Sequence, residues 1–372
     1  MSGIETTDSG TTQNMTEPMN QTPTTVDPDL RAMMRDVLGG DMTERLSQAI
    51  TGVKLDKTLW RQLSDLGLTS LTAPEAEGGS GASWLEAAAL LGESAAAARH
   101  LPLAETDLLA GWLLRTAGLP VEDPTVPRTV ALLDEGGAAD SVPWLQDAER
   151  VVVVAPSGHD FSVVELGDTE LRSITETAPA PTNSGQQRAH LRLIGPLPAG
   201  TAVPAAIVEQ LRLRGALARA AQCVGAIDRA VDLCIEHTSV RVQFGRPLAR
   251  FQAVQQLVAD AAAQAALARA AVDAAVLEAA ATDLAGGAAP GRVAVARSCV
   301  GHAASVVVRN AHQVHGAIGT TQEHPLQLFT LPVLDWRSEF GTTRSFDRRL
   351  GELLRRDPTA LWDVVLGRGG AA

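Results

Sequence analysis

Long stretches of small and apolar residues dominate the second half of this 372-residue chain. They predict four long helices, over residues 204–240, 249–285, 290–314 and 324–356. In the first helix, apolar residues recur at the spacing of one helix face: Leu211, Ala218, Ala221, Val224, Ile227, Val231 and Ile235. Alanine at this density lets helices approach closely, so the segment predicts a helical bundle. Composition alone would indicate a bundle without a ligand.

Two glycine-containing strings interrupt these helices. The first is Arg-Val-Gln-Phe-Gly-Arg-Pro-Leu at 241–248, followed at once by Phe-Gln-Ala-Val-Gln at 251–255. The second is Gln-Val-His-Gly-Ala-Ile-Gly at 313–319. Glycine and proline are ordinary ways to end a helix, so either string alone indicates only a turn. Their order along the chain carries more information than either string does.

The first third of the chain predicts short helices. They are expected at 29–38, 43–50, 57–66, 84–99 and 107–117. Asp56 is a suitable N-cap for the third of them, and Gly67 ends it. Residues 68–81 contain Pro74 and Gly-Gly-Ser-Gly, which are too many helix breakers for anything but a loop.

Between these helices and the bundle the pattern changes to short β-branched runs separated by Gly, Pro, Asp and Ser. Strands are expected at 128–133, 150–155, 161–166 and 189–193. The predicted fold class is therefore α+β. The predicted divisions are a disordered tail (1–28), an N-terminal helical domain (29–120), a small β-domain (121–202) and a C-terminal helical bundle (203–372).

Charge and composition exclude several classes of partner. The chain carries 31 basic and 43 acidic residues, a net charge of −12, which argues against nucleic acid and anionic membrane surfaces. No uncharged apolar run is long enough for a membrane span, and residues 1–28 lack the features of a signal peptide, so the expected location is the cytoplasm. His312 and His315 lie three apart without a third ligand, and the three cysteines have no metal-binding spacing. We expect no metal site, and we interpret the two histidines as helix-end or interface groups.

Taken in order, the strings resemble the flavin-dependent acyl-CoA dehydrogenases, in particular the short actinobacterial chains found as subunits of α2β2 heterotetramers. The N-terminal match consists of Trp-x-x-Leu, Leu-Gly-Leu, Pro-Glu, Gly-Gly-x-Gly, a long helix, and Pro-Leu-Ala-Glu-Thr at 102–106. The resemblance implies an N-terminal helical domain, a small central β-domain and a C-terminal four-helix bundle. It also implies FAD as cofactor and a bulky or sterol-derived acyl-CoA thioester as substrate.

The resemblance places one group of cofactor-binding residues around the first string. Arg241 would lie against the FAD pyrophosphate, Phe244 would pack on the cofactor, and Gln252 would lie near its adenine end. In homo-oligomeric relatives this set serves the flavin whose ring lies in the neighbouring subunit. A solvated arginine at a helix end is the alternative for Arg241.

The second string would supply the matching loop through Gln313, Gly316 and Gly319. Glycine lets backbone N–H groups approach phosphate closely. Ala317 stands where the family commonly has another glycine, which weakens that contact.

The catalytic carboxylate of the family is missing from its usual places. Phe340 occupies the position of the base after the glycine loop, and Gly215 occupies the alternative position on the preceding helix. Glu339 is one residue early, which on a helix turns a side chain by about 100°. We expect Glu339 to be an exposed surface glutamate. The alternative is that Pro332 bends the segment and returns Glu339 to the site as the catalytic base.

The β-domain lacks the motifs that hold the flavin ring in full-length relatives, a Trp-Ile-Thr-like strand and an acidic Gly-Ser-Asp loop. Trp144 precedes a strand instead of standing inside one. We therefore expect this domain to be structural and a homologous partner subunit to supply both ring pocket and base. A self-sufficient homo-oligomeric dehydrogenase or oxidase using Glu339 is one alternative, and a flavin-free scaffold or acyl-thioester-binding protein is another. Flavin content, with and without the partner, separates the three hypotheses.

Overall fold

Three long helices run through the length of the molecule. The computed structural model describes residues 24–356, and within them these helices are α7 (Ala205–Val240), α8 (Gln252–Thr282) and α9 (Ala289–His315). Most of the expected tail (1–28), and residues 357–372 of the expected bundle, lie outside the described residues. None of the helices described is both long enough and apolar enough to cross a membrane.

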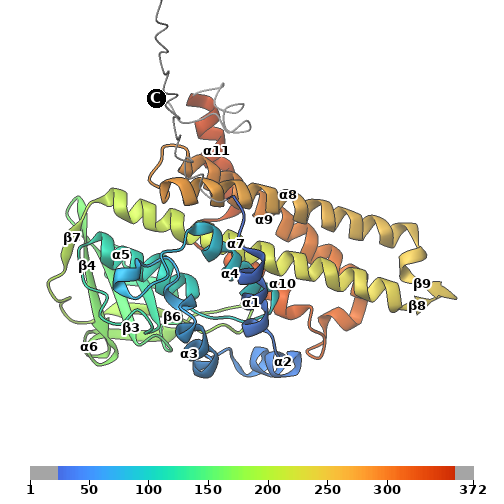
Figure 1. The fold of residues 1–372 in the computed structure, drawn as a ribbon, viewed down its shortest axis with the longest axis horizontal. Coiled ribbons are helices and arrows are strands. Elements are labelled where there is room, and N and C mark those ends of the chain that lie inside the picture. Colours follow the sequence, from blue (N-terminus) through green and yellow to red (C-terminus); the bar gives the residue numbers. More distant parts are fainter. Residues whose placement is uncertain (1–23, 357–372) are drawn as a thin grey trace, which may run out of the picture.

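The connection between α7 and α8 is a small hairpin of β8 (Val242–Gln243) and β9 (Arg246–Pro247), followed by a 3₁₀ turn, Leu248–Arg250. In Figure 1 this hairpin projects from one end of the long helices, and the central β-strands lie toward the opposite end. The hairpin therefore stands well apart from the rest of the β structure.

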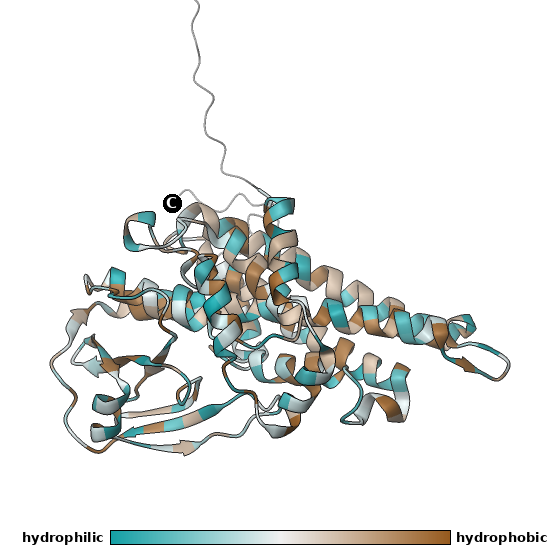
Figure 2. Cartoon of the chain, turned by 60° about the horizontal axis from the view of Figure 1, so that its bottom comes forward, coloured by the Kyte–Doolittle hydropathy of each residue, from teal (hydrophilic) through white to brown (hydrophobic). Residues whose placement is uncertain are grey.

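Small residues allow the helices to pack at short range. A Cβ atom placed on Gly225 of α7 would lie 2.1 Å from the carbonyl oxygen of Gly92 in α4 (Trp84–Ala96). Figure 2 shows hydrophobic residues among the overlapping helices of the bundle and polar residues along their outer turns. The apolar stripe predicted on the first long helix is buried in the bundle except at Ile235, which is 48% exposed.

The N-terminal helices begin where the sequence supplies caps. They are α1 (Pro28–Leu38), α2 (Met42–Thr51), α3 (Lys57–Asp65), α4 and α5 (Trp112–Thr116). The prediction for Asp56 is confirmed, because its carboxylate accepts hydrogen bonds from the N–H groups of Thr58 (3.1 Å) and Leu59 (2.9 Å). Gly67, with φ +71°, follows α3 as predicted. Ser83 and Glu86 form a capping box at the start of α4.

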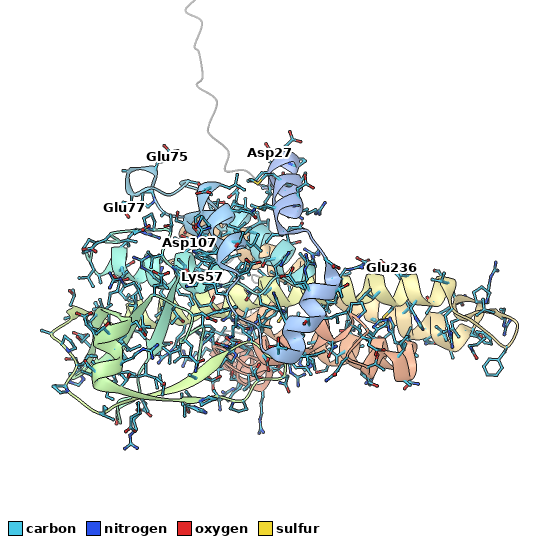
Figure 3. The ribbon with its side chains drawn as sticks, turned by 90° about the horizontal axis from the view of Figure 1, so that it is seen from below. Asp27, Lys57, Glu75, Glu77, Asp107 and Glu236 are labelled. Carbon is cyan, nitrogen blue, oxygen red and sulfur yellow. The ribbon has the colours of Figure 1, made fainter. Side chains whose placement is uncertain are left out.

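The helix expected at 107–117 begins earlier and in a different form. Residues Ala104–Gly111 are a π-helix, which continues directly into α5. The buried carboxylate of Asp107 accepts hydrogen bonds from both the N–H and the hydroxyl of Thr72, each 2.9 Å long. Figure 3 labels Asp107 inside the body of the molecule. π-Helices are rare in proteins overall, and those that occur are often found at functional sites.

The central β structure consists of two sheets. One has the order β1 (Arg128–Leu132), β3 (Arg150–Ser157), β4 (Asp160–Gly167) and β7 (Thr201–Val203), and the other has the order β2 (Ala138–Pro143), β6 (Arg188–Leu193) and β5 (Thr175–Pro179). A short helix, α6 (Asp168–Ile174), follows β4. β1 and β3 are parallel and the other pairings are antiparallel. The four predicted strands are confirmed as β1, β3, β4 and β6.

The last predicted helix, 324–356, is wrong as a single element. It forms α10 (Gln327–Trp336) and α11 (Thr343–Arg356), with a turn between them in which Phe340 has φ +55°. The guanidinium of Arg297 in α9 holds this turn by donating to the carbonyls of Trp336 (3.2 Å), Arg337 (3.0 Å), Glu339 (2.8 Å) and Gly341 (3.1 Å). These carbonyls would face an intrahelical N–H in a continuous helix, so the buried arginine replaces the helical bonds.

A second arginine joins the N-terminal helices to the bundle. The guanidinium of Arg214 lies over the rings of Trp84 (5.1 Å) and Trp112 (4.5 Å). It also pairs with Asp283 at 2.5 Å, and both indole N–H groups donate to the same carboxylate at 3.2 Å. The prediction of an α+β fold, with N-terminal helices, central β-sheets and a C-terminal domain of long helices, is confirmed.

Two glycine substitutions, one at the contact between α4 and α7 and one away from it, should have opposite effects on the stability of the protein. Gly225→Ala should destabilise the protein by about 1–3 kcal/mol, because the added methyl overlaps the Gly92 carbonyl. Gly351→Ala is the matched control: it lies inside α11, has nothing within 4 Å of its added Cβ, and should stabilise by about 0.5–1 kcal/mol. Urea unfolding of the purified protein measures both. A Gly225→Ala protein at least as stable as wild type would refute the close helix contact.

Candidate functional site

Arg241 lies at the C-terminal end of α7, where the hairpin begins. Its side chain is exposed and forms no salt bridge with any described residue. The nearby exposed Arg246 lies over the ring of Phe251 at 4.1 Å. Together with exposed Arg250 these side chains make a local positive charge on an acidic chain. An anion is the natural ligand of such a surface.

The hairpin also exposes apolar side chains. Phe244 is 92% exposed with φ +50°, and Val240 and Val242 are 78% and 53% exposed. Ile318, in the loop that follows α9, is 50% exposed. Gln252, the first residue of α8, is also exposed. Apolar residues gathered at a projecting tip are typical of a surface that a ligand or another chain covers.

The second predicted group lies beside the first. Gln313 is exposed near the end of α9, and Gly316 follows with φ +64° and nothing within 4 Å of an added Cβ. Gly319 is buried against His315. The rings of His315 and His237 have their centroids 4.5 Å apart, and His237 is in the last turn of α7 just before Arg241. The structure therefore brings the two predicted strings together at one end of the bundle.

A cleft of about 680 Å³ lies at the other end, between the β-sheets and the turn after α10. Its walls include Val130, Val142, Arg188, Glu339 and Phe340. The hairpin and this cleft are far apart. Gly215 of α7 lies against Phe340 at the cleft, and Arg241 directly follows the last residue of α7. At a rise of 1.5 Å per residue, the helix separates these two positions by roughly 40 Å. One flavin dinucleotide is much shorter than this distance.

The expectation that Glu339 is an exposed surface glutamate is wrong. Its side chain is only 14% exposed and pairs with two buried arginines, Arg219 of α7 at 2.8 Å and Arg188 of β6. Arg219 in turn pairs with Glu105, whose side chain is 2% exposed. The turn held by Arg297 directs Glu339 inward, and the two arginines compensate the charge that burial would otherwise penalise.

These partners make Glu339 a weak base. Burial would raise the pKa of its carboxyl, but the charges and hydrogen bonds of Arg219 and Arg188 outweigh burial and hold the pKa below its usual value. A general base works best when its pKa lies near the operating pH. The geometry keeps Glu339 charged and occupied as an ion-pair partner.

The two positions where the family resemblance places the base meet each other in space. A Cβ on Gly215 would lie 2.5 Å from the ring of Phe340. The aromatic ring therefore fills the space that a carboxylate at either position would need, and Gly215 leaves room for it. In this chain neither position carries an acidic side chain.

The other carboxylates that line the cleft, among the described residues, are also engaged. Asp335 accepts hydrogen bonds from Thr182 (2.8 Å), from the side chain of Asn183 (2.6 Å) and from the backbone N–H of Ser184 (3.0 Å). These bonds outweigh burial and lower its pKa. Asp140 is exposed and lies 3.1 Å from His190. Asp335 therefore lacks the raised pKa that a buried acid–base catalyst commonly shows.

Sequence reasoning missed two clusters that the structure shows. The ion-pair chain of Glu105, Arg219, Glu339 and Arg188 joins residues from all three parts of the fold. The imidazoles of His237, His315 and His324 meet beneath the hairpin. In the part of the chain that the structure describes, no group of three or more His, Cys, Asp or Glu residues is arranged to hold a metal ion.

Comparison with known proteins matches the N-terminal helical region and most of the C-terminal helical region to one family. Residues 27–120 match the family model described as acyl-CoA dehydrogenase, N-terminal domain, and residues 206–343 match the one described as acyl-CoA dehydrogenase, C-terminal domain. The chain belongs to the acyl-CoA dehydrogenase family. Its arginine-bearing hairpin and its glycine loop both lie inside the second matched range.

Curated and solved relatives extend this assignment. The chain is 32% identical to the acyl-CoA dehydrogenase IpdE2 of Mycolicibacterium smegmatis, over 74% of this chain and 80% of the relative. It is similar in fold to a chain of the ChsE4-ChsE5 complex from Mycobacterium tuberculosis, with a TM-score of 0.78, 23% identity, and 90% and 99% of the two chains covered. It is also similar to a chain of a variant of the Tcur3481-Tcur3483 steroid acyl-CoA dehydrogenase, with a TM-score of 0.77, 24% identity, and 89% and 98% covered.

The ion pairs of Glu339 predict a pH-dependent loss of stability in this acyl-CoA dehydrogenase chain. Glu339→Gln should destabilise by about 3–5 kcal/mol at pH 7, because it leaves buried Arg188 and Arg219 with one charge partner fewer. A carboxyl whose pKa is lowered by folding stabilises above its unfolded pKa, and that contribution is lost as pH falls through the folded value. The difference in unfolding free energy between wild type and Glu339→Gln should therefore shrink below about pH 4.

Denaturant unfolding at several pH values measures this effect. Glu209→Gln is the matched control, since Glu209 pairs with Arg212 at the surface, where both side chains are about half exposed. It should cost less than about 1 kcal/mol. Equal losses in the two variants would contradict a buried ion-pair chain.

Proposed function

We propose that this chain is the helper subunit of a heteromeric acyl-CoA dehydrogenase in the cytoplasm. Its hairpin end would hold the pyrophosphate and adenine of an FAD whose ring lies in a homologous partner subunit. The observation that carries the proposal is the separation of the two ends of α7. Arg241 is exposed at one end, while at the other end the ring of Phe340 lies against Gly215, where the base would stand.

The hairpin end fits the anionic part of FAD. Arg241 has a guanidinium without a protein partner among the described residues, and such a fork is suited to phosphate oxygens. Gly316 presents open backbone, which lets N–H groups approach a phosphate. Exposed Phe244 and Gln252 are placed to contact the cofactor or the partner beside it, and Gln313 and Gly319 complete the set.

The cleft end supports the view that the partner carries the catalytic base. The family's chemistry removes a proton beside the thioester carbonyl while bound FAD accepts a hydride from the neighbouring carbon. That proton needs a carboxylate with a usable pKa, and Glu339 is occupied by Arg188 and Arg219. This chain's own residues at the cleft therefore act in folding, and the partner would supply the base and the ring pocket.

The names of the relatives support a substrate class and a type of assembly. One similar solved structure is called a steroid acyl-CoA dehydrogenase, and another is a complex of two named proteins. We therefore assign this chain to an α2β2 complex that acts on bulky, sterol-derived acyl-CoA thioesters. The exposed apolar side chains around the hairpin would be covered in that complex.

Flavin content tests this proposal. The chain expressed alone should bind little FAD, and coexpression with a homologous acyl-CoA dehydrogenase chain should give a yellow complex with fewer flavins than chains. In that complex Arg241→Ala should weaken FAD binding by about 2–4 kcal/mol, because the pyrophosphate loses its charge partner. Arg241→Lys should recover only part of the loss, since lysine lacks the guanidinium fork. The absorbance ratio of flavin to protein and FAD titration of the apo-complex give both results.

Arg172→Ala is the control for charge alone, because Arg172 is an exposed arginine of α6 in the β region. It should leave FAD binding unchanged. One FAD for every chain in the protein expressed alone would favour a self-sufficient dehydrogenase. A complex without flavin would favour a scaffold or thioester-binding protein.

A further inference from the structure

Three imidazoles form a cluster beneath the hairpin. The ring centroid of His315 in α9 lies 4.5 Å from that of His237 in α7 and 4.8 Å from that of His324 in the segment before α10. His315 is only 6% exposed, and its Nδ1 donates to the carbonyl of Ala311 at 2.8 Å. Its Nε2 is buried with no hydrogen-bond partner among the described residues. A buried polar atom without a partner calls for an explanation.

The cluster is in direct contact with the predicted anion site. A Cβ placed on Gly319 would lie 2.7 Å from the Cβ of His315, so the glycine loop rests on this ring. The backbone N–H of Arg241 donates to the carbonyl of His237 at 2.9 Å. Figure 3 labels Glu236, the residue before His237, on the part of α7 that leads to the hairpin.

The surroundings of the cluster contain cations and imidazoles. The titratable groups that act on its members are, from α7, His237 and Arg241, from α9, His312 and His315, and, before α10, His324. Two carboxylates stand beside them in sequence, Glu236 and Glu323; both are exposed, and Glu236 pairs with Arg229. No carboxylate is among the groups that shift the pKa of these histidines.

The protein alone therefore disfavours protonation of the cluster. Burial, followed by repulsion from His315, His237 and His312, lowers the pKa of His324 to about 4. Burial, His315 and Arg241 lower the pKa of His237. For His315, burial lowers the pKa, whereas the carbonyls of Ala311 and Leu233 both favour a protonated ring. An imidazolium at His315 would carry a second N–H at Nε2, which has no hydrogen-bond partner among the described residues, and no carboxylate is among the groups that shift its pKa.

The geometry points to a proton-linked phosphate subsite: the cluster of His237, His315 and His324 takes up a proton from solvent when the FAD pyrophosphate binds at Arg241 and the 316–319 loop. This inference rests on the proposed function and adds a second cation to it. The pyrophosphate diester keeps its two negative charges near neutral pH, so the proton that is taken up resides on the protein. The charge of the bound anion is then shared between the Arg241 guanidinium and an imidazolium formed on binding.

Linkage fixes the direction of the pH effect. A ligand that raises the pKa of a group binds more tightly as pH falls through the range between the free and the bound pKa values. FAD affinity should therefore increase on going from pH 8 to pH 6, by up to about tenfold per pH unit for one proton. Arg241 by itself would give no such slope, because an arginine stays charged throughout this range.

Calorimetric titration tests the inference on the apo-complex of the full chain with its homologous partner. FAD is titrated at pH 7 in two buffers with different ionisation enthalpies, and the difference in apparent binding enthalpy gives the number of protons exchanged. We expect net uptake of a fraction of a proton approaching one. Equal apparent enthalpies in the two buffers, together with an affinity independent of pH, would overturn the inference.

Two variants and a control locate the proton. His237→Gln and His324→Gln replace half-buried members of the cluster and should each reduce both the uptake and the pH slope. His302→Gln is the control: His302 is an exposed residue of α9 that lies 3.1 Å from Asp347, and its loss should leave the uptake unchanged. Undiminished uptake in both cluster variants would contradict the inference.

The outcomes also separate this inference from the proposed function. Tight FAD binding that depends on Arg241 but exchanges no proton would remove the imidazole subsite and leave the helper-subunit proposal in place. A complex that binds no FAD would remove both.

Discussion

A buried chain of opposite charges joins the three parts of this protein. Glu105 comes from the N-terminal helical region, Arg188 from the central sheets, and Arg219 and Glu339 from the C-terminal helices. Removing any one member leaves at least one buried neighbour with one charge partner fewer, which is costly in a low-dielectric interior. These four side chains therefore help to hold the β-sheets, the π-helix and the turn after α10 in their relative positions.

The same chain of charges decides what the cleft can do. Two arginines fix Glu339 as a carboxylate, and the turn that directs it inward places Phe340 against Gly215. A stable ion pair and a catalytic base make opposite demands on a carboxyl group, because the first lowers its pKa and the second needs it near the working pH. This acyl-CoA dehydrogenase chain keeps the ion pair. Its exposed arginines and apolar side chains lie instead at the hairpin, at the far end of α7.

The sequence predicted the parts of the fold that depend on interactions between residues close together in the chain. The cap at Asp56 and the stop at Gly67 involve residues within one helical turn, and the long helices follow from a repeated apolar spacing. Strands β2 and β5 were missed because they contain Ala, Asp, Glu or Pro among few β-branched residues, and β7 because it has only three residues. The break after α10 depends on Arg297, which is about 40 positions earlier in the chain.

The candidate site was also predictable only in part, because some of its contacts join residues far apart in the sequence. The two strings could be assigned to one site by resemblance, and the structure places them side by side. The burial of Glu339 could not be inferred, because its partners Arg219 and Arg188 are 120 and 151 positions away. The histidine cluster likewise joins the ends of two helices and a loop, so the spacing of His312 and His315 gave no sign of it.

The central claim is that this chain holds the cofactor and leaves the proton transfer to its partner. Flavin reduction by acyl-CoA substrate in the purified, flavin-loaded complex carrying Glu339→Gln tests it most directly, since the substitution removes the basic oxygen and keeps the size of the side chain. The account predicts a rate within about tenfold of wild type, whereas loss of a catalytic base typically costs at least ~10²-fold. A rate below about a hundredth of wild type, with circular dichroism and flavin content unchanged, would show that Glu339 is the base and contradict the account.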